Sequence, residues 1–130
     1  LITPILLNHI NFNSFIKLKN LFLVRCNFSY DLRYFENLIH LKSIDLSENK
    51  LNLFQTFLPN LNDLNDIILR NVKVNSIDSP FFNFSFFPDL GTLDLSINNI
   101  SEIKYYYFVN NRALRNLNLS FNCLKHIHKD

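Results

Sequence analysis

The chain has 130 residues, of which 48% are hydrophobic and 18% charged, and its formal net charge is +2. This length allows one modest domain. Gly91 is the single glycine, which excludes a glycine-rich phosphate loop. So small a net charge does not favour binding to nucleic acid. No run of 18 apolar residues occurs, so we expect no membrane-spanning helix. The opening LITPILL lacks the charged leader of a complete signal peptide.

A pattern of eleven residues recurs five times along the chain. Its positions 1, 4, 6 and 11 are apolar, as in LKSIDLSENKL over residues 41–51. We interpret residues 1–130 as one domain, with residues 1–17 as the tail of a truncated earlier repeat. The motifs, numbered 1 to 5 in chain order, cover residues 18–28, 41–51, 64–74, 90–100 and 114–124.

Each motif predicts a short strand with one buried face, because apolar residues alternate at positions 4 and 6, as at Ile44 and Leu46. A single strand of this kind cannot bury its apolar side alone. Stacking the motifs in parallel solves this, and the 12–15 residues between motifs are long enough for the crossover that parallel strands need. We expect Phe35, Phe84 and Phe108 to fill the core from these return segments, and the insertion 77–90 to bulge from the back.

The motifs and their spacing of 23–26 residues resemble the leucine-rich repeat family over essentially the whole chain. Repeats reading LDLSxNxI, with Phe on the return, are most similar to extracellular repeats such as those of Toll-like receptor ectodomains. The resemblance implies an α/β solenoid with parallel strands on its concave face and irregular or short helical returns on its convex face. It also implies a non-catalytic module of a cell-surface receptor that binds a protein or other macromolecule. The alternative is an intracellular scaffold or regulatory subunit.

Position 9 of the motif carries asparagine in motifs 2, 4 and 5, at Asn49, Asn98 and Asn122, but Cys26 in motif 1 and Val72 in motif 3. Backbone groups buried in the turn after each strand must be paired, and an asparagine amide offers both donors and an acceptor. We therefore predict a ladder of asparagine side chains between turns. Removing one, as in Asn98→Ala, should cost about 1–3 kcal/mol, and Val72 should mark the least regular turn.

The two cysteines and four N-x-S/T sequons bear on the compartment. Cys26 and Cys123 lie four motifs apart, roughly 19 Å at about 4.8 Å per strand, beyond the reach of a disulfide. We expect either a fragment of an extracellular domain or an intracellular repeat protein with reduced thiols. Glycosylation depends on secretion, and the insertion makes Asn83 the most plausible carrier. The candidate asparagines are Asn27, Asn83, Asn99 and Asn118.

Positions 3, 5, 7 and 8 of the motifs are expected to form columns on the solvent-facing, concave side of the sheet. Position 3 reads Asn20, Ser43, Asp66, Thr92 and Asn116. Position 7 reads Val24, Ser47, Arg70, Ser96 and Ser120. A mixture of aromatic, aliphatic and charged groups on a rigid face suits recognition of a macromolecule. The candidate ligand-binding residues are Phe22, Arg25, Asp45, Glu48, Ile68, Arg70, Asp94, Ile97, Asn118 and Phe121.

Other chemistry finds weaker support in the sequence. Asp45 and Asp94 lie two strands apart, roughly 9.6 Å, but a stacked slab offers no deep pocket to raise the pKa of one carboxyl, so we expect no enzyme. Cys123, His126 and His128 do not have the spacing of a known zinc site, and we expect no metal and no cofactor. The tyrosines at 105–107 are expected to cover the back of the solenoid rather than to stack on bases.

The carboxyl end of the stack is expected to be uncovered. Solenoids end in polar capping repeats, whereas motif 5 ends with Leu117, Leu119 and Leu124. The sequence therefore predicts fraying at this end or self-association through it.

Overall fold

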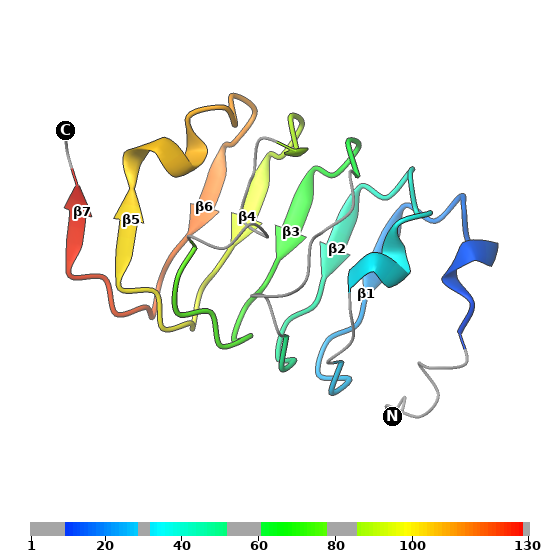
Figure 1. Ribbon diagram of the computed structural model, residues 1–130, viewed down its shortest axis with the longest axis horizontal. Helices are drawn as coiled ribbons and strands as arrows, with labels where there is room; N and C mark the ends of the chain where they lie inside the picture. The colour runs from blue at the N-terminus through cyan, green and yellow to red at the C-terminus, as the bar shows by residue number, and fades with distance from the viewer. Residues whose placement is uncertain (1–9, 29–31, 52–60, 78–85, 129–130) are drawn as a thin grey trace.

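The computed structural model describes residues 10–28, 32–51, 61–77 and 86–128, in which short strands alternate with 3-10 helices and irregular segments (Figure 1). In chain order the elements are η1 (Phe12–Ser14), β1 (Asn20–Phe22), η2 (Leu32–Phe35), β2 (Ser43–Asp45), β3 (Asp66–Ile68), β4 (Thr92–Asp94), β5 (Glu102–Lys104), η5 (Tyr105–Phe108), β6 (Asn116–Asn118) and β7 (His126–His128).

Five strands form one parallel sheet in the order β1-β2-β3-β4-β6, with one strand from each motif. The register joins equivalent positions: Leu21 pairs with Ile44, Ile44 with Ile67, Ile67 with Leu93 and Leu93 with Leu117. A second parallel sheet joins β5 to β7, and in Figure 1 these two strands run opposite to the other five. The chain therefore winds as a solenoid, with strands on one side and return segments on the other.

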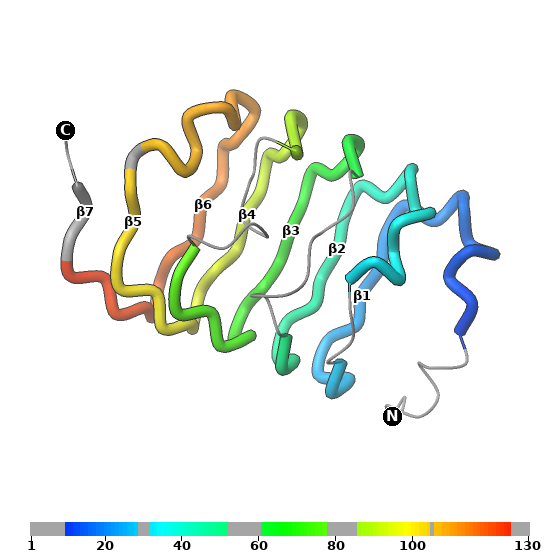
Figure 2. The backbone as a smooth tube through the Cα atoms, viewed as in Figure 1, coloured from blue at the N-terminus to red at the C-terminus, as the bar shows by residue number. Residues whose placement is uncertain are grey.

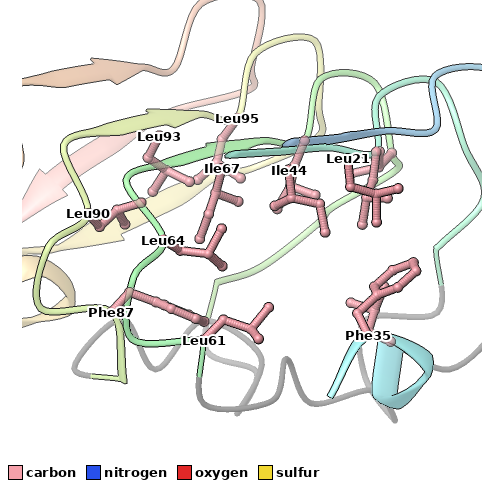
Figure 3. Packing of buried hydrophobic residues seen from close by; sticks show 14 of the residues in the cluster. Leu21, Phe35, Ile44, Leu61, Leu64, Ile67, Phe87, Leu90, Leu93 and Leu95 are labelled. Carbon is pink, nitrogen blue, oxygen red and sulfur yellow. The ribbon is translucent and has the colours of Figure 1, made fainter. Parts of the chain in front are cut away.

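The core lies between the five-stranded sheet and the return segments (Figure 3). The row at position 6 is fully buried at Leu46, Leu69 and Leu95, and the backbone amide of each donates to a carbonyl of the next motif at 2.8–3.0 Å. Burying one such side chain stabilises the fold by about 1.5–3 kcal/mol. The row at position 6 thus continues the stack beyond the strands.

Aromatic and aliphatic residues of the returns close the other side of this core. Phe35 on η2 contacts Phe12 edge-on, with ring centroids 5.1 Å apart, and stacks on Phe28 at 5.5 Å. Phe87 is buried at the place that Leu38 and Leu61 take in earlier return segments, and Phe108, the equivalent of Phe35, is half-buried. The expectation for Phe35 and Phe108 is confirmed. Residue 84 and most of the predicted bulge, 78–85, lie outside the described residues.

The two ends of the described stack differ in burial, and they lie at opposite ends of the molecule (Figure 2). Leu21 and Leu23 of motif 1 are buried. In motif 5 the equivalent Leu117 is 40% exposed and Leu119 is only half-buried, because no further motif packs on β6 within the described chain. Apolar surface is therefore open at the carboxyl end of the stack, as the sequence predicts.

Candidate functional site

The face of the five-stranded sheet that points away from the core is called the open face here, and it carries the side chains of positions 3 and 5. Phe22 on β1 is 64% exposed, Asp45, Ile68 and Asp94 are half-buried, and Asn118 on β6 is exposed. These five position-5 residues were all predicted to contact a ligand, and the register of the strands brings them into one row.

Position 5 also shapes the backbone that follows it. Oδ1 of Asp45, Asp94 and Asn118 accepts a hydrogen bond from the backbone amide two residues later, at 2.8–3.1 Å. This is the Asx turn, in which a side-chain oxygen closes a tight turn. Ile68 has no such oxygen, and there the amide of Arg70 donates to Oγ of Ser47 at 3.2 Å instead. The polar groups at position 5 therefore stabilise the turns as well as reaching the open face.

The prediction that position 7 faces solvent is wrong for two of its members. Ser47 and Ser96 are only 5% and 1% exposed, because the chain already turns towards the core at this position. Arg70 and Ser120 of the same column are exposed. Ser47 and Ser96 are short enough to be covered by neighbouring turns, whereas the arginine side chain extends beyond them. Ser120 is exposed because, within the described residues, no further turn follows motif 5.

Position 8 does not lie on a strand but in the turn after it, so its predicted place on the open face is corrected. All five residues there have left-handed backbone, with φ between 52° and 58°. The turns align along one edge of the sheet, the turn edge, which comprises positions 7–10 of every motif (Figure 2). The residues at position 8 are Arg25, Glu48, Asn71, Ile97 and Phe121.

The asparagines at position 9 form the predicted ladder. Oδ1 of Asn98 accepts from the amides of Val72 and Val74 at 3.1 Å, and Nδ2 donates to the carbonyls of Leu69 and Leu95 at 2.9 Å. Asn49 makes all four equivalent bonds, and Asn122 makes three of them, with its Oδ1 accepting, among the described residues, from the amide of Ile100 alone. Each asparagine therefore closes its own turn and pairs with the buried backbone of the motif before it.

The turns of motifs 1 and 3, which lack asparagine at position 9, have a different backbone. Val72 is fully buried, and Cys26 donates its thiol to the carbonyl of Val24 in its own turn at 3.3 Å. In these two turns position 10 is also left-handed, with φ of 50° at Asn27 and 66° at Lys73. Without the amide clamp, the chain closes the turn with a second left-handed residue. The prediction that Val72 marks an irregular turn is confirmed, and motif 1 shares the irregularity.

The register, the buried leucine rows and the asparagine ladder together decide the architecture. Residues 88–130 match the family model described as Leucine rich repeat. The fold is a leucine-rich-repeat solenoid. A comparison with curated proteins finds none that matches the chain. The match covers motifs 4 and 5, and the register extends the same geometry to motifs 1–3.

On this leucine-rich-repeat solenoid, an open hollow of about 450 Å³ lies over β4 and β6. Ile68, Asp94 and Asn118, all predicted site residues, line it together with Thr92 and Arg115. Nδ2 of Asn118 donates to Oδ2 of Asp94 at 3.0 Å across its floor. The sequence prediction missed Arg115, which stands at position 2 of motif 5. Four of the five residues at this position are polar, which could have signalled that the open face extends before the strands; they are Lys19, Lys42, Asn65 and Arg115.

The catalytic and metal hypotheses find no support in the described geometry of the repeat. Asp45 and Asp94 lie on β2 and β4 with β3 between them, and each carboxylate closes its own turn. Within the described residues no three His, Cys, Asp or Glu side chains are grouped to hold a metal ion. The side chains of His126 and His128 lie outside the described part of the chain.

The remaining candidates are distributed around the solenoid. Cys26 and Cys123 are both free thiols in motifs 1 and 5. Asn27 and Asn99 are exposed on the turn edge, Asn118 is on the open face, and residue 83 is outside the described chain. Tyr106 and Tyr107 lie on η5, where the Lys104 ammonium is about 6 Å from both ring centroids, away from the five-stranded sheet. No helix among the described residues has the length and apolar character to cross a bilayer.

Proposed function

We propose that the chain is a non-catalytic protein-binding module that recognises its partner through the open, concave face of the solenoid. The observation that carries this proposal is the row of position-5 residues, in which aromatic, aliphatic, acidic and amide side chains stand in register on five paired strands. The strands and Asx turns hold these groups in place before binding, so little conformational entropy is lost on association.

The described face is small for a stable complex. Five strands about 4.8 Å apart, open over about five residues of 3.3 Å each, give a nominal area of about 400 Å². A standard interface buries about 800 Å² on each partner. The open face is therefore one part of the binding surface, and neighbouring edges of the solenoid contribute the rest.

The test is selection of binders from a displayed library of random twelve-residue peptides on the immobilised chain. Enriched peptides are then measured by fluorescence polarisation against a face variant, Phe22→Asp with Asn118→Arg. The matched control is Ile39→Asp, which changes an exposed apolar residue on a return segment. We expect at least tenfold weaker binding to the face variant and less than a twofold change in the control. Equal binding to all three proteins would refute the use of this face.

For the setting of this module we propose the ectodomain of a cell-surface receptor, with an intracellular scaffold as the alternative. The similarity of the repeats to Toll-like receptor repeats supports the first, as do exposed sequons at Asn27 and Asn99. The free thiol of Cys123, exposed at the carboxyl end, is compatible with the second. Localisation of the tagged full-length gene product by microscopy on intact and permeabilised cells separates the two.

We also propose self-association of the isolated chain through β6. This strand is an edge of the five-stranded sheet, and Leu117 in its middle is 40% exposed although it belongs to a core row. An exposed edge strand with apolar neighbours is a template for pairing. Sedimentation velocity over a range of concentrations should show dimers or larger species, and Leu117→Lys should shift the chain to monomer.

A further inference from the structure

The left-handed backbone at position 8 accompanies a hydrogen bond between neighbouring motifs. In motifs 1–4 the amide of the position-8 residue donates to the position-7 carbonyl of the next motif, at 2.8–3.1 Å. The left-handed conformation occurs at this position in all five motifs. Asparagine and glycine tolerate this conformation best, and Asn71 occupies it in motif 3 with φ of 52°.

Ile97 and Phe121 contradict this local preference. A β-branched or bulky residue with positive φ is a genuine outlier, yet Ile97 has φ of 54° and Phe121 φ of 56°. Phe121 is also 80% exposed, the highest value among the exposed large hydrophobics of the described chain. The example of Asn71 shows that the fold needs the conformation but not these side chains. Strained residues of this kind concentrate at functional sites.

The part of the turn edge that motifs 2 and 3 form is basic. Lys50, Arg70 and Lys73 are exposed there, and none of the three forms an ion pair within the described part of the chain. The one carboxylate on the described turn edge, that of Glu48, is already paired with the guanidinium of Arg25. The edge therefore presents unpaired positive charge beside the exposed ring of Phe121 and the half-buried side chain of Ile97, which complements an acidic and apolar partner.

We propose that the turn edge of motifs 2–5 docks a protein segment that carries a carboxylate and a large apolar side chain about three residues apart. Arg70 in motif 3 and Phe121 in motif 5 lie two strands apart, about 10 Å. An extended peptide advances about 3.3 Å per residue, so a spacing of three residues matches. The carboxylate pairs with Arg70, and the apolar side chain contacts Ile97 and Phe121. This rests on the proposed function, because it assumes that the chain binds protein.

The same peptide selection tests the edge, with the turn variant Ile97→Asn/Phe121→Asn in place of the face variant. Asparagine fits the left-handed backbone, so this variant should fold with a melting temperature no lower than that of the parent. Val109→Asn is the control, because it replaces another exposed apolar residue on the return after η5. We expect enriched peptides to carry Asp or Glu three residues from Phe, Leu or Ile, and to bind the turn variant at least tenfold more weakly.

A charge exchange provides a second readout. Arg70→Glu should weaken binding of the selected peptides at least fivefold, and replacing their carboxylate by lysine should restore it. Peptides that bind the turn variant and the parent equally would overturn the edge proposal. If those peptides instead lose affinity for the Phe22/Asn118 face variant, the proposed function stands without the edge. If no peptide is enriched on the parent, both proposals fail.

Discussion

Removing one rung of the asparagine ladder has a cost that follows from the individual hydrogen bonds of Asn98. In Asn98→Ala, the amides of Val72 and Val74 and the carbonyl of Leu69 lose the partners that the described structure gives them. The carbonyl of Leu95 keeps a bond from Asn122, and that of Ser96 keeps a bond from the amide of Asn71. Three buried groups are therefore left unpaired. At about 1 kcal/mol or more for each, the free energy of unfolding should fall by about 3 kcal/mol.

The other rungs should follow an order set by their neighbours. Asn49→Ala should cost at least as much as Asn98→Ala, because the carbonyl of Leu46 loses its bond and Val72 in the next motif has no donor to replace it. Asn122 is half-buried near the open end, where water reaches the freed groups, so Asn122→Ala should cost only about 1 kcal/mol.

Urea denaturation followed by far-ultraviolet circular dichroism and tyrosine fluorescence measures these differences. Asn99→Ala is the control, because Asn99 is the exposed neighbour of Asn98 and its side chain lies outside the ladder. Its free energy of unfolding should change by less than about 0.5 kcal/mol. Equal effects of Asn98→Ala and Asn99→Ala would refute the view that the amide pairs buried backbone.

Three further outcomes follow from the same turns. In urea denaturation, the free energy of unfolding of Val72→Asn should lie within about 1 kcal/mol of that of the parent, because new turn bonds offset the lost burial. The buried control Ile67→Asn should lose at least about 3 kcal/mol. Similar losses in the two variants would contradict this prediction. Ile97→Asn should raise the melting temperature by about 3 °C, because it relieves about 1 kcal/mol of left-handed backbone strain. A lower melting temperature in thermal scans would count against that strain. After secretion behind an added leader, peptide mass mapping should find more glycan on Asn99 than on Asn118, whose Nδ2 is bonded to Asp94; equal occupancy would contradict the geometry.

The sequence predicts the stack because its strongest signal, apolar residues at fixed spacing, is also the main source of its stability. Leu46 and Leu69 recur at the same place in each motif, so one register satisfies all of them at once. The asparagine ladder is predictable for the same reason, since a buried turn needs a side chain with both a donor and an acceptor. The register of the whole sheet therefore follows from the same apolar and asparagine positions in each motif.

The shape of the turn edge is not predictable from apolar spacing. Ser47 and Ile97 both follow a strand, and their pattern does not show that the backbone turns inward at one and becomes left-handed at the other. These conformations are set by hydrogen bonds between neighbouring motifs, which a single motif does not reveal. The hollow beside Arg115 likewise forms from side chains of neighbouring motifs, so the prediction from single motifs found Ile68, Asp94 and Asn118 but neither Arg115 nor the hollow itself.

The ladder also gives the solenoid a direction. Each amide clamp is supplied by the motif that follows, so deleting motif 5 leaves the amide of Ile100 without its partner. Deleting motif 1 withdraws no such clamp from motif 2, because the Cys26 side chain bonds only within its own turn. Removing motifs from the carboxyl end should therefore open the turn of the motif before them, whereas removing motifs from the amino end leaves the next turn closed. Unfolding of the stack should accordingly begin at its carboxyl end.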